Sequence, residues 1–284
     1  MGITIRNTFA GLLAVLMACA IAACGGDTVA LDPVAQAATK TGAAESMRIE
    51  MNMTMDAPEY GSKPVTIKTK GVVAGKQSAL TMQMPAIDGV DLGQFEIRVD
   101  GLVMYMRMPF LQAAAPQLKP WIKIDLRQAG KDLGVDFDAL MELSTQTDPT
   151  KALDFLRAAG TVDELGSAKV RGVQTTRYKG VVDLERYAKQ LEKEGGGKAA
   201  ASSVRKLIEL TDKTTMPIEL WIGEDSLVRR MAWEQTVSAV AGQAPTTVKA
   251  TMELFDYGVD ADVVIPPDSQ TSSFADLQKL GEDG

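Results

Sequence analysis

Sulfur-bearing side chains are the residues of this sequence whose type and spacing could do chemistry. Methionine occurs 15 times in 284 residues, and Met51, Met53 and Met55 alternate with polar residues. The stretches 77–84 and 102–108 repeat the alternation with further methionines. A period of two places alternate side chains on one face of a β-strand. Each of the three stretches therefore predicts a strand with a methionine-bearing apolar face.

A methionine-rich face has three interpretations. Methionine can simply fill an apolar core, because its flexible chain fits irregular gaps. The same flexibility lets it line an adaptable cavity that re-packs around different ligands, and a cavity wall is also a core wall. Thioether sulfurs also bind Cu(I), although these rows contain no His or Cys. We expect the adaptable lining and keep the core and copper interpretations as alternatives.

Composition argues against several classes of function. The sequence has no histidine, which removes the commonest general base and metal ligand and rules out a Ser-His-Asp triad. No pair of carboxylates stands out for acid–base work. The formal net charge of −7 disfavours nucleic-acid binding. We therefore predict that the protein is not an enzyme, needs no cofactor or metal, and binds no nucleic acid.

The N-terminus carries a second sulfur feature, Cys24. Ile21-Ala22-Ala23-Cys24 follows an apolar run over residues 10–18 that is shorter than a membrane span. This arrangement resembles a bacterial lipobox, in which the cysteine is lipidated and becomes the new N-terminus. We expect a signal peptide over residues 1–23, an acylated Cys24, and attachment to the membrane outside the cytoplasm.

The N-terminal segment has two alternative interpretations, lipidation at another cysteine and secretion without lipidation. Leu16-Met17-Ala18-Cys19 is a poorer lipobox, because it lies inside the apolar run. Ordinary secretion after Ala23 would leave Cys24 as a free thiol. Cleavage before Cys24 removes Arg6 as the only charged residue, leaving a net charge of −8 and no second cysteine for a disulfide.

Strand patterns recur along the rest of the chain, interrupted by a few helices. We predict about eleven strands over residues 47–56, 65–73, 77–84, 94–99, 102–108, 120–126, 161–170, 173–182, 217–222, 227–237 and 246–257. Helices are predicted over 34–45 after Asp32-Pro33, 150–159 after Asp148-Pro149, 184–193 capped by Asp183, and 203–210 after a Gly-rich break at 195–197.

These elements predict an α+β fold. One large, strongly curved antiparallel sheet would form a half-barrel, and the short helices would cover its concave face. The predicted organisation is a signal peptide at 1–23, a tether at 24–31, a single domain at 32–272 and a polar tail at 273–284.

Several segments together resemble a known family. They are Trp121–Leu126, the helix after Asp148-Pro149, Val170–Leu184, Pro217–Ile222, Leu227–Arg230 and Phe255–Gly258. With the lipobox, they are similar to the LppX/LprG lipoproteins of actinobacterial envelopes and to the wider LolA-like half-barrels. The most specific piece is Gly172–Leu184.

The resemblance implies a cavity between sheet and helices that binds an acylated lipid or another hydrophobic ligand, for carriage or transfer across the envelope. An envelope transport protein would then be a partner. The alternative is an envelope interaction protein with a closed core. The residues expected to line the cavity are Met51, Met53, Met55, Met82, Met84, Met104, Met106, Ile122, Ile124, Leu220, Met231 and Trp233.

Overall fold

The computed structural model describes residues 28–56, 64–86, 91–133, 138, 160–193, 198–211, 213–237 and 245–282. These residues fall into two compact units, which we call unit 1 (residues 1–43 and 130–245) and unit 2 (residues 44–129 and 246–284). The predicted leader, Cys24, the helix over 150–159 and the Gly-rich break at 195–197 lie outside the described residues.

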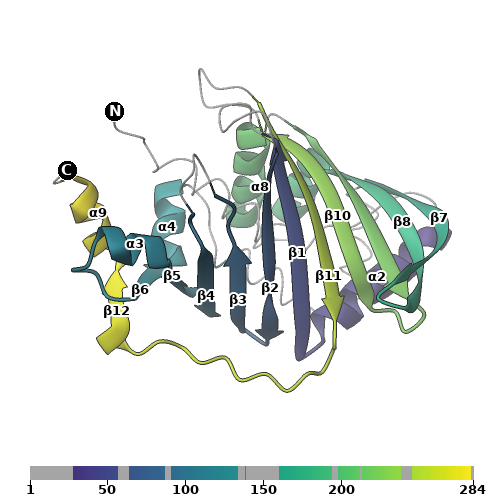
Figure 1. Cartoon of the computed structure of the whole chain (residues 1–284). Coiled ribbons are helices and arrows are strands. Elements are labelled where there is room, and N and C mark those ends of the chain that lie inside the picture. Colours follow the sequence, from purple (N-terminus) through teal and green to yellow (C-terminus); the bar gives the residue numbers. More distant parts are fainter. Residues whose placement is uncertain are drawn as a thin grey trace. The chain divides into compact units, whose positions relative to one another are not determined.

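Unit 2 is built from antiparallel strands with short helices at one end (Figure 1). Its strands are β1 (Ser46–Asp56), β2 (Val65–Ala74), β3 (Gln77–Gln83), β4 (Gln94–Asp100), β5 (Val103–Arg107), β6 (Trp121–Asp125), β11 (Thr246–Phe255) and β12 (Thr271–Ser273). Its helices are α3 (Pro109–Ala114), α9 (Phe274–Glu282) and the 3₁₀ turn η2 (Asp268–Gln270). Helix α4 (Leu126–Leu133) runs from unit 2 into unit 1.

The strands of unit 2 pair in a simple meander. β11 pairs with β1, and β1 to β6 then pair successively, all antiparallel. Only the short β12, among the pairs described, is parallel to its neighbour, β6. The hairpin turn predicted at Asp100-Gly101 is confirmed. Gly101 has a positive φ of 58°, a conformation that glycine adopts without a Cβ clash.

Besides the end of α4, the described part of unit 1 consists of three helices and four strands. Its elements are α2 (Thr28–Gly42), β7 (Gly160–Val170), β8 (Val173–Asp183), α7 (Leu184–Lys193), α8 (Lys198–Thr211), β9 (Thr215–Gly223) and β10 (Val228–Val237). β7 to β10 pair antiparallel in sequence order, α7 contacts β8 and β9, and α8 contacts α7 and β10. The two-residue turn between β7 and β8 places Arg171 and Gly172 at φ 49° and 82°, as a type I′ hairpin requires.

The α+β class and the open, mainly antiparallel sheet are confirmed. The strand order is β12-β6-β5-β4-β3-β2-β1-β11 in unit 2 and β10-β9-β8-β7 in unit 1, so the described residues contain twelve strands where the sequence predicts about eleven. The predicted Asp183 cap is also confirmed, because its carboxylate accepts a 2.9 Å hydrogen bond from the backbone N–H of Arg186.

Some predicted boundaries are wrong at the helices. α2 starts at Thr28 rather than after Asp32, and it contains Pro33. α8 starts at Lys198 rather than Ser203. α4 is missed because Asp125, read as a strand residue, accepts a 2.9 Å hydrogen bond from the backbone N–H of Arg127 and so caps a helix.

The polar tail predicted over 273–284 is largely helix α9. Ser273 and Asp276 form a capping box. The backbone N–H and hydroxyl of Ser273 donate to the Asp276 carboxylate at 2.9 and 2.7 Å, and the Asp276 N–H donates back at 3.1 Å. These reciprocal bonds satisfy backbone donors that a free helix start leaves unpaired.

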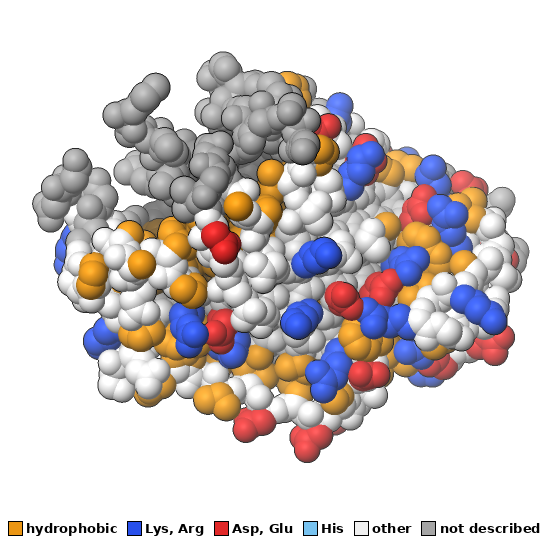
Figure 2. All heavy atoms as spheres, in the orientation of Figure 1, with side chains coloured by type: hydrophobic (Ala, Val, Ile, Leu, Met, Phe, Trp, Pro, Cys, Tyr) orange, Lys and Arg blue, Asp and Glu red, His pale blue; other side chains and the backbone are white. Residues whose placement is uncertain are grey.

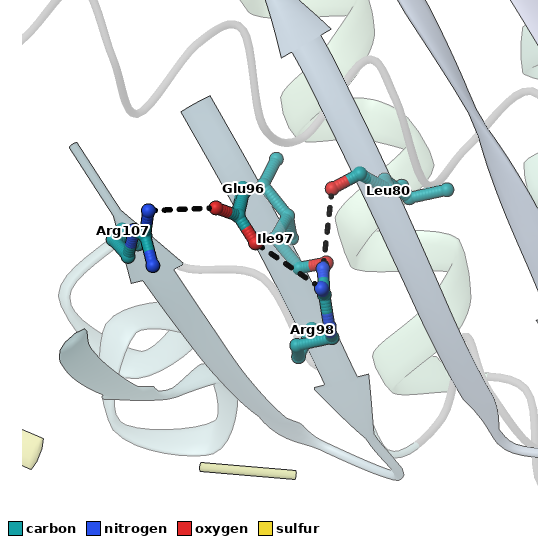
Figure 3. A network of polar contacts seen from close by, with 5 residues as sticks. All are labelled: Leu80, Glu96, Ile97, Arg98 and Arg107. Carbon is teal, nitrogen blue, oxygen red and sulfur yellow. Dashed lines mark hydrogen bonds and ion pairs between the residues drawn. The ribbon is translucent and has the colours of Figure 1, made fainter. Parts of the chain in front are cut away.

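One face of the unit 2 strands is polar. Charged side chains are spread over the strand face seen in Figure 2. On β4, Glu96 forms 3.2 Å ion pairs with both Arg98 and Arg107, and Arg98 donates to the backbone carbonyl oxygens of Ile97 and Leu80 (Figure 3). This network belongs to one side of the pleat, so the alternate residues of the same strands form the opposite, apolar side.

Candidate ligand-binding site

The apolar side of unit 2 brings the predicted methionine strands together in register. Met51 on β1 lies opposite Thr69 on β2, Thr69 lies opposite Met82 on β3, and Met82 lies opposite Phe95 on β4. All four side chains are buried. We call this side of β1–β6 the methionine face. The three methionine-bearing strands predicted from sequence thus share one face.

The row continues at the other end of the sheet. Met106 on β5 lies opposite Ile122 on β6, and Met104 lies opposite Ile124. Met104, Met106 and Ile122 are buried, whereas Ile124 is half-buried. Eight of the predicted lining residues thus lie on one face of unit 2, and a ninth, Met84, follows directly after the end of β3.

A local core covers part of this face. Ile122 and Ile124 pack with Ala115 and Leu118 in a cluster that also includes Leu111 of α3 and Leu277 of α9. The ring of Phe95 stacks on Phe110 of α3 with centroids 5.5 Å apart. For Ile122 and Ile124, the chain itself supplies the packing partners, which is the core interpretation rather than the cavity interpretation.

The remaining methionines differ in burial along the strands. Met51 and Met53 are buried in the middle of β1, and Met53 lies opposite Ile67 and Ala250. Met55 is half-buried near the end of β1, and Met84 is half-buried just after β3 ends. The buried centre of the methionine face is therefore Met51, Met53 and Met82.

Three predicted lining residues belong to unit 1 instead. Leu220 on β9 lies opposite Met231 on β10, and Trp233 lies opposite Ile218. Leu220 and Trp233 are buried, and Met231 is half-buried. A strict alternation over the predicted strand 227–237 would put Leu227 on the same side as Met231 and Trp233, which is not what the structure shows. A bulge between Val228 and Arg230 shifts the alternation, so the buried Val228 pairs with Ile222 on this face.

Three buried polar groups lie among these apolar side chains without a hydrogen-bond partner in the described part of the chain. They are the hydroxyl of Thr69, the indole N–H of Trp233 and the side-chain amide nitrogen of Gln235. Their exposed fractions are 3%, 5% and 7%. Buried polar atoms in proteins are nearly always paired, so each of these marks a place that needs an explanation.

Thr69 and Gln235 are site residues that the sequence reading missed. Both occupy inward positions of alternating strands, Thr69 between Ile67 and Gly71, and Gln235 two residues after Trp233. A polar residue at an inward position is the signal that could have identified them.

One titratable side chain is buried among the strands of unit 1. Tyr178 on β8 lies opposite Leu220, and burial, with the nearby charge of Glu164, raises the pKa of its phenol above the usual value of 10.0. Raising that pKa keeps the phenol protonated and uncharged. No group of three His, Cys, Asp or Glu side chains placed to hold a metal ion occurs among the described residues.

The part of the chain that the structure describes contains no helix long and apolar enough to cross a membrane. Cys24, the predicted lipidation site, lies outside that part. Anchoring at Cys24 therefore stays a prediction from the sequence.

Comparison with known proteins supports the fold. No family model matches the sequence. An "uncharacterized 31.2 kDa protein in rplA-rplJ intergenic region" of Streptomyces griseus is 24% identical over 257 residues, covering 87% of this chain and 79% of that protein. This relative extends over nearly the whole chain and carries no functional description.

Among solved structures, the lipoprotein LppX of Mycobacterium tuberculosis matches with a TM-score of 0.50 at 13% identity, covering 84% of this chain and 100% of LppX. LprF from Mycobacterium bovis matches with a TM-score of 0.43 at 12% identity, covering 85% and 99%. At these identities the likeness concerns the fold, and the LppX-type α+β half-barrel predicted from sequence is confirmed by the first of them.

Proposed function

We propose that this protein is a membrane-anchored lipoprotein that binds an acylated lipid or a similar hydrophobic ligand and carries it within the cell envelope. The observation that carries the proposal is the methionine face, on which Met51 and Met53 of β1 and Met82 of β3 are buried, with Thr69 of β2 between Met51 and Met82. The LppX-like fold is a second support.

The chemistry of this face suits flexible apolar ligands. A methionine side chain has three rotatable bonds and a polarizable sulfur, so a wall of methionines re-packs around acyl chains of different length at little cost. Valine and isoleucine are stiffer at χ1 and would hold one shape. Among the described residues, no group of three His, Cys, Asp or Glu side chains placed to hold a metal ion competes with this use.

Anchoring follows from the lipobox at Cys24. Two or more acyl chains hold a protein stably at a membrane, whereas one chain binds only marginally. The folded part would then stay close to the lipid that it loads or unloads. A protein partner of the envelope transport machinery is part of the same proposal.

A closed core is the second candidate function, in which the protein is an envelope interaction protein that holds no ligand. The stacked pair Phe95 and Phe110 and the cluster around Ile122 favour it, because they show part of the methionine face covered by the chain's own side chains. In this case the outer surface would bind a protein partner.

Native mass spectrometry distinguishes the two. Residues 25–284, which lack the anchor, are exported to the envelope of a bacterial host and purified. We expect this protein to carry bound lipid, which is then identified after organic extraction. Protein that is uniformly ligand-free, together with a stoichiometric protein partner captured by crosslinking in cells, would reject the carrier proposal in favour of the closed core.

A further inference from the structure

Two buried hydrogen-bond donors stand side by side on β10. Trp233 and Gln235 are two residues apart, so their side chains lie on the same side of the strand, roughly 7 Å apart along it. Both are more than nine-tenths buried. Neither the indole N–H of Trp233 nor the amide nitrogen of Gln235 has an acceptor among the described residues.

Leaving these donors unpaired is unfavourable. A buried donor without an acceptor has given up its hydrogen bonds to water without replacing them, and β10 carries two such donors. The indole nitrogen can only donate, and the amide nitrogen donates two hydrogens. What would satisfy both is an acceptor oxygen that reaches this side of β10.

The surroundings indicate a neutral acceptor. Trp233 lies opposite Ile218, which in turn lies opposite Gly180 of β8. Met216 and Val182 form the next pair of these strands, and all four residues are buried and uncharged. A phosphate or carboxylate taken into such surroundings would lack a counter-charge and pay a large desolvation penalty. A carbonyl oxygen carries no such penalty.

Helix α8 completes the setting. It contacts β10, and it buries Ala201 and Val204 together with the polar Ser203 and Thr211, which have interactions of their own. The two donors therefore lie in a mainly apolar layer of unit 1, and a ligand that reaches them must be apolar over most of its length. An acyl chain joined through a carbonyl group has this composition.

We infer that Trp233 and Gln235 bind the carbonyl oxygen of an acyl ester, so that the ligand is an ester-linked acyl lipid rather than a plain hydrocarbon or an ether lipid. The inference rests on the proposed function and narrows it, because it names the linkage that the protein recognises. Apolar side chains hold the chain, and the two donors hold the oxygen that an ester has and an ether lacks.

A competition between matched lipids tests this. The full chain, purified in detergent, is mixed with equal amounts of 1,2-dioleoylglycerol and 1,2-di-O-oleylglycerol, and the bound ratio is read by native mass spectrometry. The two lipids share chains and head group and differ in their carbonyl oxygens. One net hydrogen bond corresponds to a preference of about two- to tenfold for the ester.

Two variants and a control complete the design. Gln235→Met keeps the volume and removes the amide, and Trp233→Phe removes the N–H. Each is expected to reduce the ester-to-ether ratio by about two- to tenfold. Phe leaves a void, but a void affects both lipids alike and leaves the ratio readable. Glu234→Gln, on the exposed side of the same strand, is expected to leave the ratio unchanged.

The outcomes separate this inference from the proposed function. If neither lipid binds, the proposed function fails. If both bind equally to the unmodified protein, or if both variants keep its preference, only the ester inference is overturned. A lower melting temperature for ligand-free Gln235→Met with an unchanged ratio would likewise overturn it, because the amide would then be serving the protein's own structure through bound water.

Discussion

Met51 on β1 and Thr69 on β2 are direct cross-strand partners, and both are buried on the methionine face. Thr69 lies opposite Met82 on its other side, so its hydroxyl is flanked by two thioether side chains. No described group pairs with that hydroxyl. A single polar atom therefore interrupts an otherwise apolar row.

Replacing Thr69 with valine removes this hydroxyl and keeps the shape of the side chain. We expect the free energy of unfolding to rise by about 1 kcal/mol, because a buried unpaired hydroxyl is unfavourable. Urea unfolding measures it. Thr66→Val is the control, since Thr66 is exposed on the opposite face and its substitution should change stability by less than about 0.5 kcal/mol. A clear loss of stability in Thr69→Val would show that the hydroxyl is paired.

Substituting Met51 and Met53 with isoleucine tests whether the methionine face is adaptable. Isoleucine is of similar volume and favours strands, so each change should cost less than about 1.5 kcal/mol. We expect the double variant to fold but to bind a narrower range of acyl-chain lengths, measured by extracting co-purified lipid. Met47→Ile, on a half-buried residue near the start of β1, is the control. If the double variant loses stability and lipid binding to the same extent, Met51 and Met53 are residues of an ordinary apolar core and not an adaptable lining.

Gly71 is needed where β2 approaches β3. A Cβ at this position would overlap the carbonyl oxygen of Ala79 and lie 2.8 Å from the Cα of Leu80. These are backbone atoms that cannot turn away, so Gly71→Ala should destabilise the protein by about 1–3 kcal/mol in thermal or urea unfolding. At Gly42, a Cβ would meet no atom within 4 Å, and Gly42→Ala should be neutral or slightly stabilising. Similar effects of the two substitutions would contradict the close approach.

The stability of the start of α9 should fall at acid pH because of Asp276. The hydroxyl of Ser273, followed by its backbone N–H, lowers the pKa of the Asp276 carboxyl. A lowered pKa in the folded state stabilises the fold above the unfolded-state pKa, and this contribution disappears as pH falls through the folded-state pKa. We therefore expect faster amide exchange in α9 as pH is lowered from 5 toward 2, after correction for intrinsic exchange rates.

The Asp276→Asn variant is the control for that measurement. It removes the titrating group, so α9 should exchange faster at neutral pH and lose most of its acid dependence. An unchanged acid dependence in this variant would assign the effect to another carboxylate.

Membrane attachment should depend on Cys24. Cys24→Ala removes the thiol that would be acylated. We expect the variant to carry no acyl chains and to be lost from the membrane fraction when cells are fractionated. Mass spectrometry of the N-terminal peptide gives the modification directly. Cys19→Ala is the matched control, because it alters the poorer lipobox. Acylation that survives Cys24→Ala but not Cys19→Ala would move the anchor to Cys19.

Much of the fold could be read from local patterns. The alternation in 47–56 and 173–182 predicts β1 and β8 to within one residue, because a strand with one wet face carries a period of two in its own sequence. The Asp183 cap and the Asp100-Gly101 turn are equally local. α3 and α4 are not predicted from the sequence. Each is short and directly follows a strand pattern, so it does not contain enough residues to show a helical period.

The candidate site was only partly predictable. The inward positions of Met51, Met82 and Met106 follow from alternation, and the sequence thus determined which residues share a strand face. Alternation failed at β10, where the bulge after Val228 changes which residues face inward. No local pattern reveals a bulge of this kind, because it arises from how β10 pairs with β9.

What the sequence by itself determined was therefore the set of apolar faces and the α+β class, since each depends on neighbouring residues alone. The leader with Cys24 stays a prediction from the sequence. The tertiary structure decided that Met51, Thr69 and Met82 lie in one row, that Ile122 is packed by α3 and α9, and that Trp233 and Gln235 are buried without acceptors. Register, burial and hydrogen-bond pairing are relations between segments distant in the chain, and they exist only once those segments are packed.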